Sequence, residues 1–192
     1  MEYSLAIENT PDSIPGGTGI LLLHPSTGET DRLDTDFLST DTDSLLVIST
    51  RTTAREVEQK LEYYEVNEEK ATILDTMSVE RGYTRRKSDN VRYVSAPDDW
   101  ESIVEKTEEF LTDHEGKRRV SFDSITELIY YADEDRAGEA VERLLGLLAE
   151  HDAVGMFHLA QGVHDEETLD RFRTLFGGII ELGEDGQITS EF

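Results

Sequence analysis

The chain has 192 residues, enough for one domain with a sizeable core. It contains no cysteine, which excludes disulfides and thiolate metal sites. Acidic residues outnumber basic ones by 43 to 18, and the net charge of −25 argues against broad binding to nucleic-acid backbones. No apolar run approaches the roughly 20 residues that cross a bilayer. The N-terminus lacks a signal-peptide pattern, so we expect a cytoplasmic protein without membrane insertion.

Apolar runs and apolar periodicity predict the elements in chain order. Residues 1–18 are expected to be an N-terminal extension or a short edge strand. The expected core strands are 19–24, 44–50, 71–75, 91–95, 120–123, 153–159 and 179–182. The expected helices are 53–64, 98–114, 124–131, 134–150 and 166–176, whereas 31–43 is a poor helix sequence. Residues 183–186 join two C-terminal strands in a hairpin pattern. The alternation predicts an α/β fold with a mainly parallel sheet between helices and an antiparallel C-terminal edge.

Two helix starts carry capping signals. Asp98 and Glu101 have the spacing of a capping box after Pro97. Asp165 stands three residues before Thr168 and is expected to cap the helix that follows.

The segment GILLLHPSTGET, residues 19–30, has the outline of a phosphate-binding strand and turn. In the motif GxxxxGK[ST], backbone N–H groups wrap the phosphates, a lysine reaches the outer phosphates and a hydroxyl holds Mg²⁺. Gly28 fits the second glycine, but the first glycine is missing and Glu29 replaces the lysine. Because a carboxylate repels a triphosphate and donates no hydrogen bond, Thr30 is expected to be an ordinary turn residue.

Later segments resemble RecA/KaiC-like P-loop ATPases. The stretch RRVSFDSITEL, residues 118–128, looks like a Walker B strand that ends in Asp-Ser before a helix. SLLVISTRTTAREVEQKL resembles the second strand and helix of those domains, AVGMFHL their next core strand and LFGGIIELGEDGQI their terminal hairpin. The resemblance spans roughly residues 14 to 192 and implies one RecA-like domain over 1–192. His24 and Glu29 stand where that family has its Walker A glycine and lysine.

Asp123 matches the family aspartate that holds Mg²⁺ through water. With the phosphate grip lost, we expect it instead to cap the helix that begins near Ser124, where a carboxylate suits the helix dipole. We therefore expect neither ATP nor Mg²⁺ as a cofactor. A metal site in which His24, His158 and His164 join Asp123 and Asp165 is the alternative. No recognised ligand spacing supports it, so no metal is predicted.

Basic residues are scarce, which makes their clusters informative. Five of them form a basic island between positions 81 and 92: Arg81, Arg85, Arg86, Lys87 and Arg92. The island could bind an anion, a nucleotide or an acidic partner, or it could neutralise neighbouring carboxylates. Residues 117–119 form a second cluster, Lys-Arg-Arg.

The acidic residues are spread through every segment, as in haloarchaeal proteins, whose acidic surfaces suit a salt-rich cytoplasm. VRYVSAPDDW and YYADEDRAGEAVERLL are similar to haloarchaeal members of the RecA/KaiC group, many of them uncharacterised or regulatory. The leading hypothesis is a non-catalytic regulatory or scaffolding protein that acts through a protein partner or self-association. A degenerate nucleotide-binding protein and a DNA-associated or transcriptional regulator are the alternatives.

Overall fold

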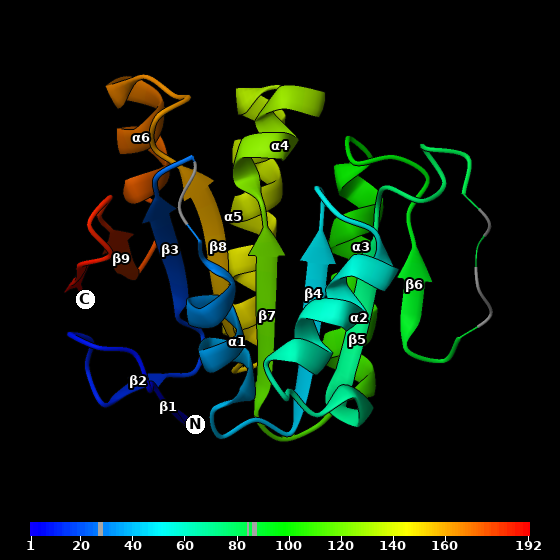
Figure 1. Ribbon diagram of the computed structural model, residues 1–192, viewed down its shortest axis with the longest axis horizontal. Coiled ribbons are helices and arrows are strands. Elements are labelled where there is room, and N and C mark those ends of the chain that lie inside the picture. The colour runs from blue at the N-terminus through cyan, green and yellow to red at the C-terminus, as the bar shows by residue number, and fades with distance from the viewer. Residues whose placement is uncertain (27–28, 84, 86–87) are drawn as a thin grey trace.

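An eight-stranded sheet forms the centre of the computed structural model, which describes residues 1–26, 29–83, 85 and 88–192 (Figure 1). The strand order across the sheet is β10-β9-β3-β8-β7-β4-β5-β6. In chain order its strands are β3 (Gly19–His24), β4 (Ser44–Ser49), β5 (Ala71–Asp75), β6 (Val91–Tyr93), β7 (Arg118–Asp123), β8 (Val154–Ala160), β9 (Gly178–Leu182) and β10 (Ile188–Glu191).

Every pairing in this sheet is parallel except β9 with β10. The continuous apolar runs of β3, β4 and β8 are buried along almost their whole length, as expected for strands covered on both faces. The predicted α/β fold, with its mainly parallel sheet and antiparallel C-terminal edge, is therefore confirmed.

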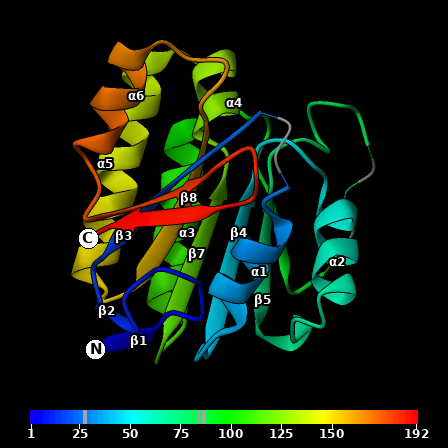
Figure 2. The same ribbon diagram turned by 60° about the vertical axis from the view of Figure 1, so that its left-hand side comes forward.

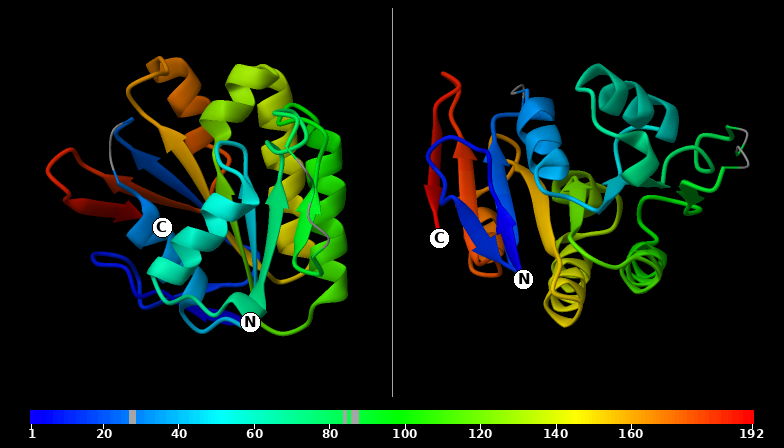
Figure 3. Two further views of the ribbon diagram at one scale, coloured as in Figure 1. Left: turned by 45° about the vertical axis from the view of Figure 1, so that its right-hand side comes forward. Right: turned by 90° about the horizontal axis from the view of Figure 1, so that it is seen from below.

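Helices cover both faces of the sheet (Figure 3). One face packs against α3 (Trp100–Asp113), α4 (Ile125–Tyr131), α5 (Glu134–Glu150) and α6 (Glu166–Arg173). The other face packs against α1 (Asp31–Ser39) and α2 (Ala54–Tyr63), and a short 3₁₀ turn, Glu68–Lys70, follows α2. The stretch expected to be a poor helix does form α1, which lies across β7 and buries Leu33, Phe37 and Leu38. Within the described ranges, no helix is long and apolar enough to cross a membrane.

The N-terminal residues form a separate hairpin below the main sheet (Figure 2). Strand β1 (Glu2–Ser4) pairs antiparallel with β2 (Ser13–Pro15), and neither strand extends the eight-stranded sheet. Tyr3 and Ile14 are buried in the core on the α1 face. Asn9, in the hairpin loop, donates a hydrogen bond to the carbonyl of Ile188 on the edge strand β10. This contact covers part of an edge that another strand could otherwise extend.

The caps differ in part from those expected. Helix α3 is capped by Asp99, which accepts from the amide of Ser102, so the predicted capping position of Asp98 is wrong by one residue. Asp165 caps α6 by accepting from Thr168 N at 2.8 Å, as predicted.

Candidate functional site at the carboxyl ends of the central strands

The carboxyl ends of β3, β8, β7 and β4 lie side by side, the place where open α/β sheets bind ligands (Figure 1). His24 ends β3 and Asp123 ends β7. Thr30 is buried directly before α1, and its side chain makes no capping hydrogen bond. Glu29 is exposed and accepts a hydrogen bond from the hydroxyl of Tyr64 at 3.3 Å. Gly28 lies outside the described residues.

A buried ionic network lies directly beneath this edge, and its centre is Asp34 of α1. The Asp34 side chain is fully buried. Its Oδ2 accepts from Lys60 Nζ of α2 at 3.0 Å, and its Oδ1 lies 2.8 Å from His158 Nε2 of β8. The hydroxyl of Ser121 on β7 also donates to Oδ1. Because the carboxylate receives bonds from three elements, it ties α1 to the sheet and to α2.

The charges of this network stabilise one another. Burial alone raises the pKa of Asp34, but Lys60 and His158 outweigh it and hold that pKa far below its usual range. Burial lowers the pKa of His158, yet the charges of Asp123 and Asp34 outweigh it and leave that pKa raised. Burial also lowers the pKa of Lys60, but the charge of Asp34 outweighs burial and leaves that pKa raised. The Asp34 carboxylate is therefore ionised, with Lys60 and His158 as its hydrogen-bond partners.

Asp123, the Walker B-like residue, is bound to a cation from its own chain. Both of its carboxylate oxygens accept from Arg51, at 3.0 Å from Nε and 2.9 Å from Nη2. Burial raises the pKa of Asp123, but His158 and Arg51 outweigh it and lower that pKa. The residue that caps α4 is Ser124, whose hydroxyl accepts from Glu127 N. The predicted capping role of Asp123 is therefore wrong, because its carboxylate faces Arg51 across the ends of β7 and β4.

The histidines do not gather into one site. His24 and His158 are neighbours, with ring centroids 6.0 Å apart, and burial lowers the pKa of His24. His164 instead pairs with the hydroxyl of Thr126 at 3.0 Å, and Asp165 is occupied by its cap. In the part of the chain that the structure describes, no group of three or more histidine or carboxylate residues could hold a metal ion.

Sequence reasoning missed Asp75, which ends β5 at the same edge. Its fully buried carboxylate accepts from the amides of Ala54, Met77 and Ser78, each at 2.8 Å, and from the Ser78 hydroxyl. The bond to Ala54 satisfies the first turn of α2, for which the Thr53 side chain makes no cap. Asp75, at the end of β5, therefore acts as the cap of helix α2.

The basic island is divided between two places. Arg81 and Arg85 are exposed, and Arg81 donates to the carbonyl of Arg51 at 3.3 Å, beside the Asp123–Arg51 pair. Arg86 and Lys87 lie outside the described residues. Arg92 of β6 instead donates to the carbonyl of Asp89 at 2.7 Å.

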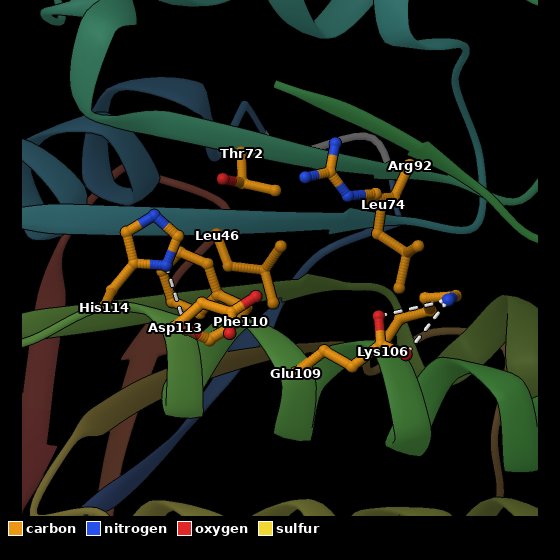
Figure 4. Close-up of a pocket in the computed structure, with 9 residues that line it drawn as sticks. All are labelled: Leu46, Thr72, Leu74, Arg92, Lys106, Glu109, Phe110, Asp113 and His114. Carbon is orange, nitrogen blue, oxygen red and sulfur yellow. Dashed lines mark hydrogen bonds and ion pairs between the residues drawn. The ribbon is translucent and has the colours of Figure 1, made fainter. Parts of the chain in front are cut away.

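Arg92 also lines a small pocket between α3 and the sheet (Figure 4). Lys106, which pairs with Glu109, and His114 line the same pocket. Its volume of about 30 Å³ holds a water molecule or two and excludes a nucleotide. Arg92 therefore does not face the carboxyl ends of the central strands.

The second basic cluster, residues 117–119, is structural. Lys117 pairs with Asp41, and the Arg118 guanidinium donates to four backbone carbonyls, those of Leu111, His114, Gly116 and His151. Arg119 is fully buried.

One signal in the sequence indicates most of this network. Along β7, Arg119, Ser121 and Asp123 alternate with Val120 and Phe122, so the three polar side chains share one face of the strand. A polar face on a strand buried on both sides requires polar partners from the covering helix. Helix α1 supplies such a partner in Asp34. The local sequence of β7 does not show that Asp34 is this partner, because the two elements are far apart in the chain.

Three solved structures are similar in fold to this one. The first is an ATPase of the type III secretion system of pathogenic bacteria, with a TM-score of 0.62, 13% identity and coverage of 90% of this chain and 53% of that chain. The second is the KaiC-like protein PH0186 of Pyrococcus horikoshii, with a TM-score of 0.60, 14% identity and coverage of 93% and 78%. The third, PH0250 of the same organism, has a TM-score of 0.62, 12% identity and coverage of 92% and 87%.

These likenesses show a RecA/KaiC-like fold, and this chain spans about half the length of the secretion ATPase, 53%. No curated protein matches the chain at a significant level. A family model described as a family of unknown function, DUF7090, matches residues 1–192. The chain therefore belongs to the DUF7090 family, and its fold is that of the RecA/KaiC-like ATPases.

Proposed function

We propose that this protein is a non-catalytic RecA/KaiC-like module that regulates or scaffolds other proteins through protein contacts. The observation that carries the proposal is the bidentate pair between Arg51 and Asp123. An arginine guanidinium with two parallel hydrogen bonds is a strong partner for a carboxylate. The Walker B-like carboxylate is therefore neutralised by its own chain, and a catalytic metal would have to displace Arg51.

The loss at the phosphate-binding turn points the same way. Glu29 brings negative charge to the position that a lysine takes in a working P-loop. Beneath it, Lys60 is committed to Asp34 by a 3.0 Å ion pair and is largely buried, so it does not replace the missing lysine. Phosphoryl transfer depends on positioning and electrostatic stabilisation of the phosphates. The glutamate at position 29 and the ion pair of Lys60 with Asp34 therefore support a non-catalytic role for this edge.

The proposed setting is the cytoplasm of a halophilic archaeon. The net charge of −25 gives the surface a self-repulsion that molar salt screens, because the Debye length falls to about 3 Å at 1 M. Measurements of activity and binding therefore belong in molar KCl.

The test is ATP turnover by the purified protein in molar KCl with Mg²⁺. We expect no turnover above that of the buffer in the wild-type protein or in Asp123→Asn. Asp165→Asn is the matched control, because it removes a carboxylate of similar size from a helix cap remote from Arg51. Turnover that Asp123→Asn abolishes and Asp165→Asn leaves intact would overturn the proposal.

A second candidate function, nucleotide binding without efficient hydrolysis, is favoured by the position of Arg81. Its bond to the Arg51 carbonyl brings a cation of the basic island beside the carboxyl ends of β4 and β7. Calorimetry with ATP, GTP and cyclic dinucleotides in molar KCl tests this candidate. Binding heat that Arg81→Gln removes, and that the remote control Arg136→Gln leaves unchanged, would support it. The absence of heat with all three ligands would exclude it.

A further inference from the structure

An open groove is lined by residues of α4 and of the loop that follows β8. These two segments lie beside the carboxyl ends of the central strands (Figure 1). The volume of the groove is about 540 Å³. The apolar part of its lining consists of Ile129, Tyr130, Tyr131 and Val163. Tyr130 is 81% exposed and Val163 is 58% exposed. Apolar and aromatic side chains that gather on one exposed surface mark a protein-binding site more often than scattered ones do.

The groove is held in shape by hydrogen bonds beneath it. The Thr126 hydroxyl accepts from the amide of Ala160 at 2.9 Å and pairs with His164 Nε2 at 3.0 Å. These bonds join the first turn of α4 to the end of β8 and to the loop beyond it. The rings of Tyr130 and Tyr131 pack edge to face with centroids 5.2 Å apart. A partner would therefore meet walls that are largely pre-formed, which lowers the ordering cost of binding.

Among the described residues that line the groove, the carboxylate is Glu127. His164 lies at the rim of the groove. Burial lowers its pKa and outweighs the charges of Glu134 and Asp165, which raise it. The imidazole is therefore mainly neutral near pH 7, and Glu127 sets the sign of the groove. An apolar groove with an acidic side chain is complementary to a segment that carries both a cation and an aliphatic group.

We propose that this groove docks a segment of another protein in which an arginine or lysine stands beside an aliphatic side chain. The aliphatic group would pack between Ile129 and Val163, and the cation would lie over the ring of Tyr130, within reach of Glu127. A second copy of this chain fits less well, because a two-fold contact through the groove would bring Glu127 against its symmetry mate. The inference rests on the proposed function and names the surface through which it is exerted.

The probe is a fluorescently labelled synthetic peptide that carries arginine and leucine in a glycine–serine background. Its binding to the full-length protein is measured by fluorescence anisotropy in molar KCl, where long-range attraction to the acidic surface is screened. The double variant Tyr130→Ser/Val163→Ser removes the exposed walls of the groove. Tyr63→Ser on α2 is the matched control, because Tyr63 is 78% exposed and lies outside the groove.

We expect the double variant to weaken binding at least about tenfold and Tyr63→Ser to leave it unchanged. A peptide with glutamate in place of arginine is expected to bind as weakly as the double variant does. The docking proposal is overturned if the wild-type protein does not bind the peptide or if both variants bind it equally. It is also overturned if the groove variant loses self-association instead, because the occupant is then a second copy. These outcomes do not depend on ATP turnover. The docking proposal and the proposed lack of catalysis are therefore tested by separate experiments.

Discussion

Strand β7 carries buried charge at both of its ends, and the two ends are stabilised in different ways. At the carboxyl end, Asp34 and Asp123 are matched by Lys60, His158 and Arg51 through ion pairs of 2.8 to 3.0 Å. At the amino end, Arg119 is fully buried, and no carboxylate of the described residues is in hydrogen-bond contact with it.

Arg119 depends on weaker contacts. Its Nη2 donates to the carbonyl of Ser4 at 2.7 Å, and its guanidinium lies 5.3 Å from the ring centroid of Tyr3 and 5.1 Å from that of Phe37. Nε and Nη1 have no hydrogen-bond partner in the described part of the chain. Burial lowers the pKa of Arg119 to about 10. The carboxyl end is therefore a closed ionic unit, whereas at the amino end one cation, Arg119, holds the N-terminal hairpin against α1.

Removing the charge of Asp34 from the ionic unit is expected to lower the stability of the protein most. Asp34→Asn leaves Lys60 and His158 buried without their counter-charge, and we expect a loss of about 3–5 kcal/mol in unfolding free energy. Urea unfolding in molar KCl measures it. Asp36→Asn is the control on the same helix, because Asp36 is partly exposed and its ion pair with Arg32 is 3.9 Å long. Equal losses in the two variants would contradict the central role of Asp34.

The amino end is expected to tolerate loss of its charge. Arg119→Met keeps an aliphatic side chain and removes two unsatisfied donors, so we expect a change within about 1 kcal/mol. Arg119→Ala also removes the packing against Tyr3 and Phe37 and is expected to cost about 2–4 kcal/mol. Thermal unfolding of both variants compares them. A loss as large for methionine as for alanine would mean that the charge, and not the packing, holds the hairpin.

At the carboxyl end of β7, the contribution of His158 to stability is expected to depend on pH. His158 faces Asp34, Asp123, Lys60 and His24, and its pKa in the folded protein is raised above the ordinary value of about 6.5. Its stabilisation is therefore complete below about pH 6.5 and is lost as the pH rises through the raised pKa.

The measurement is urea unfolding of the wild-type protein and His158→Gln at pH 6 and at a pH above the raised pKa. We expect the stability difference between the two proteins to shrink as the pH rises. His164→Gln is the control, because burial lowers the pKa of His164 and the sign of its contribution is opposite. A difference that grows with pH would mean that His158 is neutral in the folded protein.

The sequence is sufficient to predict the strands of the central sheet, but it does not predict the separate β1–β2 hairpin or the ionic unit. The runs of β3, β4 and β8 are apolar along their length, and Asp165 stands at a local capping distance from Thr168, so short-range patterns identify them. The partners of Asp34 lie 26 positions away at Lys60 and 124 away at His158. Only the strand order brings such positions together. The sequence does not reveal the partner of Asp123 for the same reason: its neighbour Ser124 suggests a helix cap, whereas its partner Arg51 lies 72 positions away.

The smallest expected effect tests whether Glu29 alone separates this chain from a working P-loop. Glu29 is exposed, and its hydrogen bond to Tyr64 is 3.3 Å long, so Glu29→Lys is expected to leave the unfolding midpoint unchanged. We also expect no gain of Mg²⁺-dependent ATP turnover, because Arg51 still holds both oxygens of Asp123 and the first glycine of the motif is still absent. Phosphate release in molar KCl measures it, with Glu29→Gln as the matched control. Turnover gained by the lysine variant alone would show that the Arg51–Asp123 pair opens for a metal as soon as the phosphates are gripped. Without that gain, a lysine at position 29 does not compensate for the Arg51–Asp123 pair together with the missing first glycine.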